Sequence, residues 1–261
     1  MKRHFLFIIL ICSVNQMIIA QDYSLYEKHL YVKAGDTLPY RLLLPENYNP
    51  AKKYPLILFL HGAGERGNDN ELQLVHGAGL FLRDSIRKNY PAIVVFPQCA
   101  ASSYWSNVQF KIDSVTKKRI MQFSVNGEPT IAMKLLIGLL QKLAHDHKLD
   151  KRRIYLGGLS MGGMGSFELV SRKPELFAAV FPICGGANPA IAKKLKQPSW
   201  WIFHGLKDDV VDPDLSKQMA GALKKVGADV KLTLYPDANH NSWDPAFAEK
   251  DLFPWLFSKT K

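Results

Sequence analysis

Short apolar runs alternate with amphipathic stretches along most of the chain. Six runs end in or near glycine or proline and have the composition of buried strands: YPLILFLHG, AIVVFPQ, RIYLGGLS, FAAVFPICGG, SWWIFHG and VKLTLYP. Between them, apolar residues recur every three or four positions, which predicts helices at about residues 71–88, 130–147, 161–172, 214–226 and 245–258. Strands that alternate with helices predict a mostly parallel sheet with helices on both faces.

Two segments depart from this alternation and are predicted to be hairpins. HLYVKAG and LPYRLLLP flank a turn at Gly35 and Asp36, which predicts an antiparallel hairpin near the N-terminus. Residues 102–129 hold two alternating polar and apolar stretches around a basic turn, which predicts an inserted hairpin. The insert follows the strand AIVVFPQ, so we expect it at the carboxyl edge of the sheet, as a lid or pocket wall.

The first twenty residues have the pattern of a signal peptide. A basic start precedes an apolar run at residues 5–14, and Ala20 supplies a small residue for cleavage. The run is too short to span a bilayer comfortably, so we expect removal of residues 1–20 on export, with an uncleaved anchor as the alternative. Residues 21–261 are then expected to form one secreted or periplasmic domain without stable membrane insertion.

The charge and the cysteines narrow the classes of partner. The net charge is +11, but the lysines are spread over many stretches, without zinc-type cysteine pairs, an aromatic ribonucleoprotein signature or a basic zipper. We therefore expect a solvated basic surface and no nucleic-acid partner. Cys99 and Cys184 each close a different predicted strand, and the sequence does not decide whether they form a bridge or what the oligomeric state is.

The stretch GGLSMGG places a serine between glycines. Residues 158–162 match G-x-S-x-G, directly after the strand RIYLG and at the start of a predicted helix. In that strand–turn–helix context the motif predicts a strained turn that presents Ser160 as a nucleophile. The alternative is that Ser160 merely caps the helix.

A serine hydroxyl needs a base, and the base needs a carboxylate to fix its tautomer. The strand VKLTLYP is followed by DANHNSW, which offers His240, and the strand SWWIFHG is followed by LKDDVVDP, which offers Asp208 and Asp209. Both loops leave the edge of the sheet at which Ser160 is expected. The spacing leaves the choice between the two aspartates open, and His204 is expected to shape the acid loop.

The loop LHGAGERGNDN has the composition of an oxyanion-binding loop. It can aim the backbone N–H of Ala63 at the site, while the N–H of Met161 follows the serine. The loop lacks both phosphate-cradling glycine patterns. We expect Glu65 and Arg66 to form an ion pair that orders the loop, or Arg66 to meet a substrate carboxylate.

Together these motifs resemble the α/β-hydrolase superfamily. The HGAGERG loop, the serine elbow and the strand end PICGG are similar to its small secreted serine esterases: the feruloyl and acetyl-xylan esterase, polyhydroxybutyrate depolymerase-like and dienelactone hydrolase-like group. The resemblance runs from about Tyr40 to the C-terminus, and the insert at 102–129 departs from the compact members. The acid loop of that group looks like H-G-x-x-D-x-x-V, which implies Asp208 as the acid and Val211 as a packing residue.

The resemblance implies a secreted serine ester hydrolase that uses a Ser-Asp-His triad and an acyl-enzyme, with no cofactor and no metal. Its substrates would be small or polysaccharide-linked esters, including acylated carbohydrates and aromatic esters. The alternatives are a serine peptidase of the prolyl oligopeptidase type, a noncatalytic binding module and an interaction protein with a basic surface. The candidate substrate contacts are Trp105, Trp243, Arg66, Tyr104 and Phe110, with core packing as the alternative for the aromatic residues.

Overall fold

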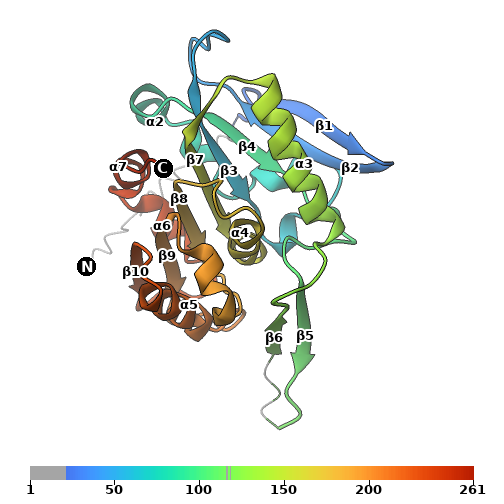
Figure 1. The fold of residues 1–261 in the computed structure, drawn as a ribbon, viewed down its shortest axis with the longest axis vertical. Helices are drawn as coiled ribbons and strands as arrows, with labels where there is room; N and C mark the ends of the chain where they lie inside the picture. Colours follow the sequence, from blue (N-terminus) through green and yellow to red (C-terminus); the bar gives the residue numbers. More distant parts are fainter. Residues whose placement is uncertain (1–21, 116, 118) are drawn as a thin grey trace, which may run out of the picture.

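An eight-stranded, mostly parallel sheet forms the centre of the protein (Figure 1). The computed structural model describes residues 22–115, 117 and 119–261, so the predicted signal peptide lies outside the described residues. The strand order is β1-β2-β4-β3-β7-β8-β9-β10, parallel from β4 to β10 and antiparallel at β1 and β2. The strands are β1 (Glu27–Lys33), β2 (Asp36–Leu43), β3 (Tyr54–Leu60), β4 (Ile93–Pro97), β7 (Leu149–Leu159), β8 (Ala179–Ile183), β9 (Ser199–Gly205) and β10 (Val230–Tyr235). The predicted sheet is confirmed.

Helices cover both faces because successive side chains of each buried strand point to opposite sides. Leu56, Leu58 and Leu60 of β3 pack into one core with α3 (Ile131–Asp146), α4 (Met161–Arg172) and α5 (Pro213–Lys225). Ile57 and Phe59 of the same strand pack into a second core. The helices on that second face are α1 (Ala78–Phe81), α2 (Asp84–Asn89), α6 (Trp243–Ala248) and α7 (Leu252–Phe257). The central strands are therefore packed between helices on both faces of the sheet.

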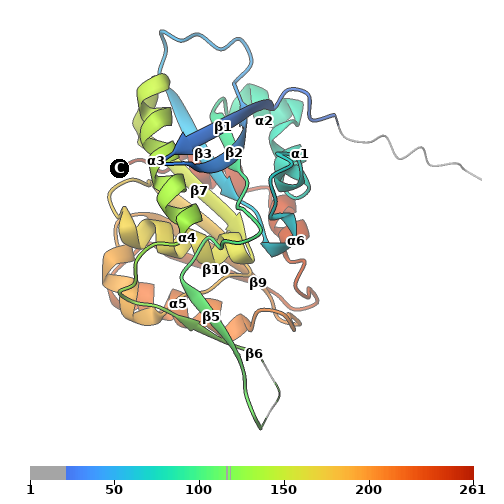
Figure 2. The ribbon, with the colours of Figure 1, turned by 90° about the vertical axis from the view of Figure 1, so that its right-hand side faces the viewer.

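Both predicted hairpins are confirmed, but the turn of the first lies one residue earlier than the predicted Gly35 and Asp36, because Asp36 already pairs in β2. Strands β1 and β2 join through a two-residue turn at Ala34 and Gly35, where both residues have positive φ (52° and 87°), as a tight antiparallel hairpin requires. The insert forms β5 (Val108–Ile112) and β6 (Arg119–Phe123), a separate two-stranded antiparallel sheet. Figures 1 and 2 show this hairpin extending away from the rest of the protein.

Two predicted helices are broken in the structure. The stretch 71–88 becomes a 3-10 turn, α1 and α2, because two residues leave helical geometry: Gly77, with a left-handed φ of 89°, comes before α1, and Arg83, with an extended ψ of 129°, comes between α1 and α2. The stretch 245–258 becomes α6 and α7. Pro254 has no backbone N–H to donate four residues back, so a helix from 245 cannot run through it without losing a hydrogen bond.

Candidate active site

Ser160 lies in a sharp turn between β7 and α4. Its backbone angles, φ 52° and ψ −114°, are in a region that non-glycine residues rarely adopt. The turn is held by hydrogen bonds from the Ser160 N–H to the Ile183 carbonyl (2.9 Å) and from the Met164 N–H to the Ser160 carbonyl (3.0 Å). The hydroxyl faces His240 and does not cap α4, which removes the capping alternative.

Glycines let the strand and the helix approach each other closely at this turn. A β-carbon on Gly162 would lie 2.0 Å from the carbonyl oxygen of Leu60, and one on Gly158 would lie 2.4 Å from the carbonyl oxygen of Gly162. Both distances are far below any van der Waals contact. The G-x-S-x-G pattern is therefore a packing requirement of this elbow.

The structure brings Ser160, His240 and Asp208 into one chain of hydrogen bonds. The Ser160 Oγ lies 3.0 Å from Nε2 of His240, and Nδ1 of the same ring lies 2.8 Å from Oδ2 of Asp208. The loops after β9 and β10 supply the acid and the imidazole. Asp208 is buried against His240 while Asp209 is exposed, so of the two aspartates that the spacing left open it is Asp208 that contacts the imidazole.

Asp208 is held by more groups than His240 alone. Its Oδ1 accepts from the N–H groups of Val210 and Val211, each at 2.9 Å, and its Oδ2 also lies 3.1 Å from Nε2 of His204. Burial by itself would raise the pKa of this carboxyl. The hydrogen bonds from His204, His240 and the Val211 N–H outweigh burial and hold the pKa well below its ordinary value, so the carboxylate is ionised.

His204 was expected to shape the acid loop, and it does so by contacting Asp208, together with Ser216, which the sequence did not indicate. The fully buried His204 ring lies between Asp208 and Ser216, with Nδ1 2.7 Å from the Ser216 hydroxyl, and that hydroxyl donates to the Gly185 carbonyl at 2.8 Å. Nε2 also faces the carbonyl of Val211 at 3.0 Å, so it carries a proton that two oxygens can accept. The four-residue spacing from His204 to Asp208 was the only signal in the sequence.

His61 fixes the orientation of the oxyanion loop. Its Nε2 accepts from the Cys99 N–H at 2.9 Å, so Nδ1 carries the proton and donates to the Gly62 carbonyl at 2.6 Å. The Gly62 carbonyl and the Ala63 N–H belong to one planar trans peptide and point in opposite directions. The Ala63 N–H is thereby directed away from His61, and Ala63 lines the cavity at Ser160.

A cavity of about 190 Å³ opens onto Ser160 and His240. Ala63, Tyr104 and Trp243 line it, as the sequence analysis expected of residues near the site. The Trp243 ring stands perpendicular to the His240 ring, with centroids 5.5 Å apart. Glu65 and Val211, which the sequence analysis gave other roles, also line it, together with residues that the sequence did not indicate: Met121, Leu159, Met164 and Val210. Met121 belongs to β6, so the insert contributes to the pocket wall.

Two candidate substrate contacts do not fit their positions. Trp105 is fully buried, with its ring edge-on to His61 at 5.4 Å, because the side chain points into the core beneath the oxyanion loop. Arg66 donates to the carbonyls of Ala63 (3.0 Å), Ala101 (3.1 Å) and Ser103 (3.3 Å). Arg66 therefore connects the oxyanion loop to the backbone of the loop that follows β4.

Glu65 does not pair with Arg66 as the sequence analysis expected. Its carboxylate faces two histidines, with Oε2 3.9 Å from Nδ1 of His61 and Oε1 3.8 Å from Nε2 of His76. Arg66 instead donates hydrogen bonds to backbone carbonyls, so Glu65 and Arg66 interact with different groups. The Glu65 carboxylate thus places a negative group in the wall of the cavity.

Both cysteines are buried free thiols, so they do not form a bridge. Burial raises the pKa of Cys99 to about 12 and that of Cys184 well above its ordinary value. The Cys184 sulfur and ligand atoms of Asp208 and His240 lie within 4.8 Å of one another. A metal would need the thiolate and would have to replace the hydrogen bond between the other two residues, so the cluster fits a triad beside a neutral thiol better than a metal centre.

Comparison with known proteins identifies the group to which this fold and elbow belong. The family model named Esterase matches residues 33–254, which is most of the chain. The chain belongs to the Esterase family. Its fold is the α/β-hydrolase fold, and the enzyme is a serine esterase, as the sequence predicted.

Three relatives illustrate the similarity. A thermostable esterase of known structure is 32% identical, with a TM-score of 0.79 over 91% of this chain and 64% of its own. Lysophospholipase-like protein 1 of Mus musculus is 28% identical over 70% of this chain and 79% of its own length. A protein described as probable feruloyl esterase C, from Aspergillus oryzae, is 25% identical over 67% of this chain and 56% of its own. The esterase thus spans less than two thirds of the first and third of these proteins.

Within the described residues, no helix is both long enough and apolar enough to cross a bilayer.

The buried His61 ring predicts a pH-dependent stability of the esterase. Burial lowers the pKa of His61 to about 4, whereas in the unfolded chain the ring takes up a proton below about 6.5. Between these values only the unfolded state is protonated, so falling pH favours unfolding. At pH 4 this difference in protonation should lower the free energy of unfolding by about 3 kcal/mol.

The measurement is denaturant unfolding at pH 7 and pH 4.5 of wild type and His61→Gln. The variant should lose less free energy of unfolding than wild type on acidification. His145→Gln is the matched control, because the side chain of His145 is 89% exposed, and it should behave as wild type. The same pH dependence in all three proteins would show that His61 does not cause it.

Proposed function

We propose that the chain is an exported carboxylic-ester hydrolase in which Ser160, His240 and Asp208 form a catalytic triad. The observation that carries the proposal is the hydrogen-bond chain from the Ser160 hydroxyl through His240 to Asp208, built on a strained elbow. A serine in that backbone conformation, next to an imidazole whose other nitrogen faces an ionised carboxylate, has the arrangement that activates a hydroxyl. The signal pattern of residues 1–20 supports export. N-terminal sequencing of the exported protein should then find Gln21 as its first residue.

In the first half of the reaction, Ser160 Oγ attacks the ester carbonyl carbon and His240 Nε2 takes the hydroxyl proton. Asp208 accepts the Nδ1–H bond, which fixes the tautomer with a lone pair on Nε2 and stabilises the imidazolium that forms. When the tetrahedral intermediate collapses, the bond to the alcohol oxygen breaks. His240 returns the proton to that oxygen, and the acyl group remains on Ser160.

In the second half, a water molecule takes the place of the alcohol. His240 removes its proton as it attacks the acyl carbon, and the Ser160 oxygen leaves with the proton that His240 then returns. The products are a carboxylic acid and the free serine hydroxyl.

Two backbone N–H groups are proposed to meet the oxyanion, those of Ala63 and Met161. The Met161 N–H is at the first position of α4, where the helix dipole favours negative charge. The Ala63 N–H is directed by the His61 hydrogen bond to the Gly62 carbonyl. Preplaced donors of this kind are typically worth a factor of about 10² to 10³ in rate each.

The cavity supports esters with a compact acyl group. Its volume of about 190 Å³ and its lining by Tyr104, Met121 and Trp243 suit an acetyl or a flat aromatic acyl group. Feruloyl, which the name of one relative contains, is a flat aromatic acyl group. We therefore propose acylated carbohydrates and aromatic esters as the substrate class.

The test is hydrolysis of 4-nitrophenyl acetate, butyrate and octanoate and of methyl ferulate, beside a proline-containing chromogenic peptide. Acetate or ferulate should be preferred over octanoate by at least about tenfold in kcat/KM, since a compact cavity excludes a long chain. Turnover of the peptide alone would assign the chain to the peptidases of the prolyl oligopeptidase type. Binding of esters without turnover would make it a noncatalytic module.

A further inference from the structure

A second cleft adjoins the catalytic cavity. Its volume is about 410 Å³, and it lies between the root of the inserted hairpin, α4 and the 3-10 helix Pro189–Leu195. Met164 lines both the cleft and the cavity. On β6, Met121 lines the cavity and Phe123 lines the cleft, and residues two apart on a strand face the same side. A substrate held at Ser160 can therefore extend into the cleft.

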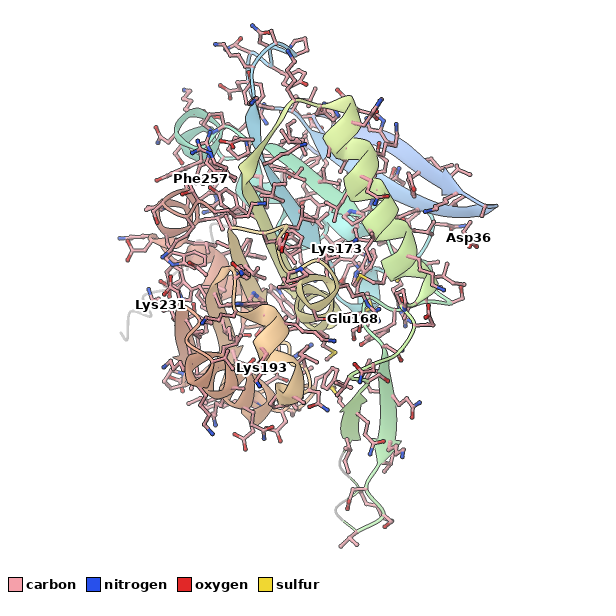
Figure 3. All side chains as sticks on the ribbon, viewed as in Figure 1. Asp36, Glu168, Lys173, Lys193, Lys231 and Phe257 are labelled. Atoms are coloured by element: carbon pink, nitrogen blue, oxygen red, sulfur yellow. The ribbon has the colours of Figure 1, made fainter. Side chains whose placement is uncertain are left out.

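The cleft carries positive charge. Glu168 is its one lining carboxylate among the described residues, and Arg172 already pairs with it through two nitrogens at 2.9 and 2.7 Å. Lys173 and Lys194 are exposed and add two positive charges that this pair does not neutralise. Glu168 lies in α4 and Lys173 directly follows this helix, and both are labelled in Figure 3.

The catalytic cavity has the opposite charge preference. The Glu65 carboxylate lines it, and the Glu65 side chain is only 13% exposed. A carboxylate on the acyl group would meet this negative charge at low dielectric, which is unfavourable. An anionic group of the substrate is therefore favoured in the cleft and disfavoured in the cavity.

The remaining lining of the cleft suits sugar rings. Ser124, Asn126, Ser171 and Asn188 offer hydroxyl and amide groups, and Phe123 and Ile137 offer apolar surface. A sugar ring has polar edges and apolar faces and can use both. The volume is within the roughly 300–1,000 Å³ of small-molecule sites.

We propose that this cleft binds the alcohol portion of the ester as a glycan that carries carboxylates, a uronate-containing oligosaccharide. The inference rests on the proposed function, because it assigns the leaving group of the same reaction. The acyl group occupies the small cavity at Ser160, and the uronate carboxylates lie against Lys173 and Lys194.

The experiment compares three acetate esters with the full-length mature enzyme. Acetylated trigalacturonate is anionic, acetylated xylotriose is neutral, and 4-nitrophenyl acetate is too small to reach the cleft. The test variant is Lys173→Gln with Lys194→Gln. The control is Lys193→Gln with Lys225→Gln, which removes the same charge from exposed positions outside the cleft.

Wild type should hydrolyse acetylated trigalacturonate with about a tenfold higher kcat/KM than the xylotriose ester. The test variant should lose this advantage through KM, and raised salt should weaken it in wild type. Turnover of the two uncharged substrates should stay within about twofold in both variants. No preference in wild type, or an equal loss in the control variant, would overturn the proposal. An anionic lysophospholipid is assayed beside the three acetate esters, and a charge-dependent preference for it over the trigalacturonate ester would also overturn the proposal, in favour of a lipid headgroup.

A binding measurement separates failure of this inference from failure of the proposed function. Calorimetry with unacylated trigalacturonate and the Ser160→Ala protein needs no turnover. Binding that weakens about tenfold when Lys173 and Lys194 are also replaced supports the cleft even if no ester is hydrolysed. Absence of binding to a variant that melts like wild type would refute the cleft even if 4-nitrophenyl acetate is hydrolysed.

Discussion

Ser160→Ala is expected to lower kcat for 4-nitrophenyl acetate by about 10⁴- to 10⁶-fold with the fold intact. The hydroxyl is the only group of the proposed triad that forms a bond to carbon, and loss of a triad nucleophile typically has an effect of this size. A methyl group in place of the hydroxymethyl group leaves the elbow hydrogen bonds of the Ser160 backbone in place. A fluorophosphonate probe should label wild type and leave the variant unlabelled.

Ser166→Ala is the matched control. Ser166 lies in α4 close to the elbow, is fully buried, and its hydroxyl donates to the Gly162 carbonyl at 2.9 Å. The same chemical change there removes a hydrogen bond without touching the reacting groups, so activity should fall by less than about tenfold. Continued labelling of Ser160→Ala, or equal losses in the two variants, would mean that another residue is the nucleophile.

Asp208→Asn should lower kcat by about 10³- to 10⁴-fold, while Asp209→Asn should stay within about threefold of wild type. An amide at position 208 cannot be ionised, so it cannot stabilise the imidazolium of His240, and its NH₂ group can select the wrong tautomer. Asp209 is exposed and differs by one position in the same loop, which makes it the control. The measurement is kcat for 4-nitrophenyl acetate, with the melting temperature of each variant.

Asp208 also has a structural role, and the experiment must separate the two. Four groups bond to its carboxylate, so Asp208→Asn should melt at a lower temperature. Ser216→Ala weakens the support of His204 without changing the carboxylate, and it should lower the melting temperature with a much smaller loss of kcat. If Ser216→Ala lost as much kcat as Asp208→Asn, the acid would act only by holding the loop.

The sequence predicted the strands, the mostly parallel sheet and the elbow because these depend on local pattern. Buried strands have continuous apolar runs, and glycine is required at position 162 because a β-carbon there would lie 2.0 Å from the Leu60 carbonyl oxygen. The positions of Asp208 and Asp209 could not be separated by pattern alone, since both follow the same strand. The burial that distinguishes them arises only when the loop folds over His204.

Side-chain direction in loops was the least predictable feature. Tyr104 and Trp105 are adjacent aromatic residues after β4, yet Tyr104 lines the cavity and Trp105 is buried against His61. Arg66 was expected to form an ion pair or to meet a substrate carboxylate, but backbone carbonyls accept its hydrogen bonds, one in its own loop and two in the loop after β4. Such choices depend on residues far away in sequence, which a pattern of polar and apolar positions does not contain.

The strained turn at Ser160 links reactivity to the order of folding. Its left-handed backbone is unfavourable on its own and is held by the Ile183 carbonyl of β8 and by the contact of Gly162 with Leu60 of β3. These partners come from strands that are distant in sequence and meet only when the central sheet assembles. In a chain whose central sheet has not assembled, neither partner is in place to hold this conformation of Ser160. We therefore expect the proposed nucleophile to form only together with the finished sheet.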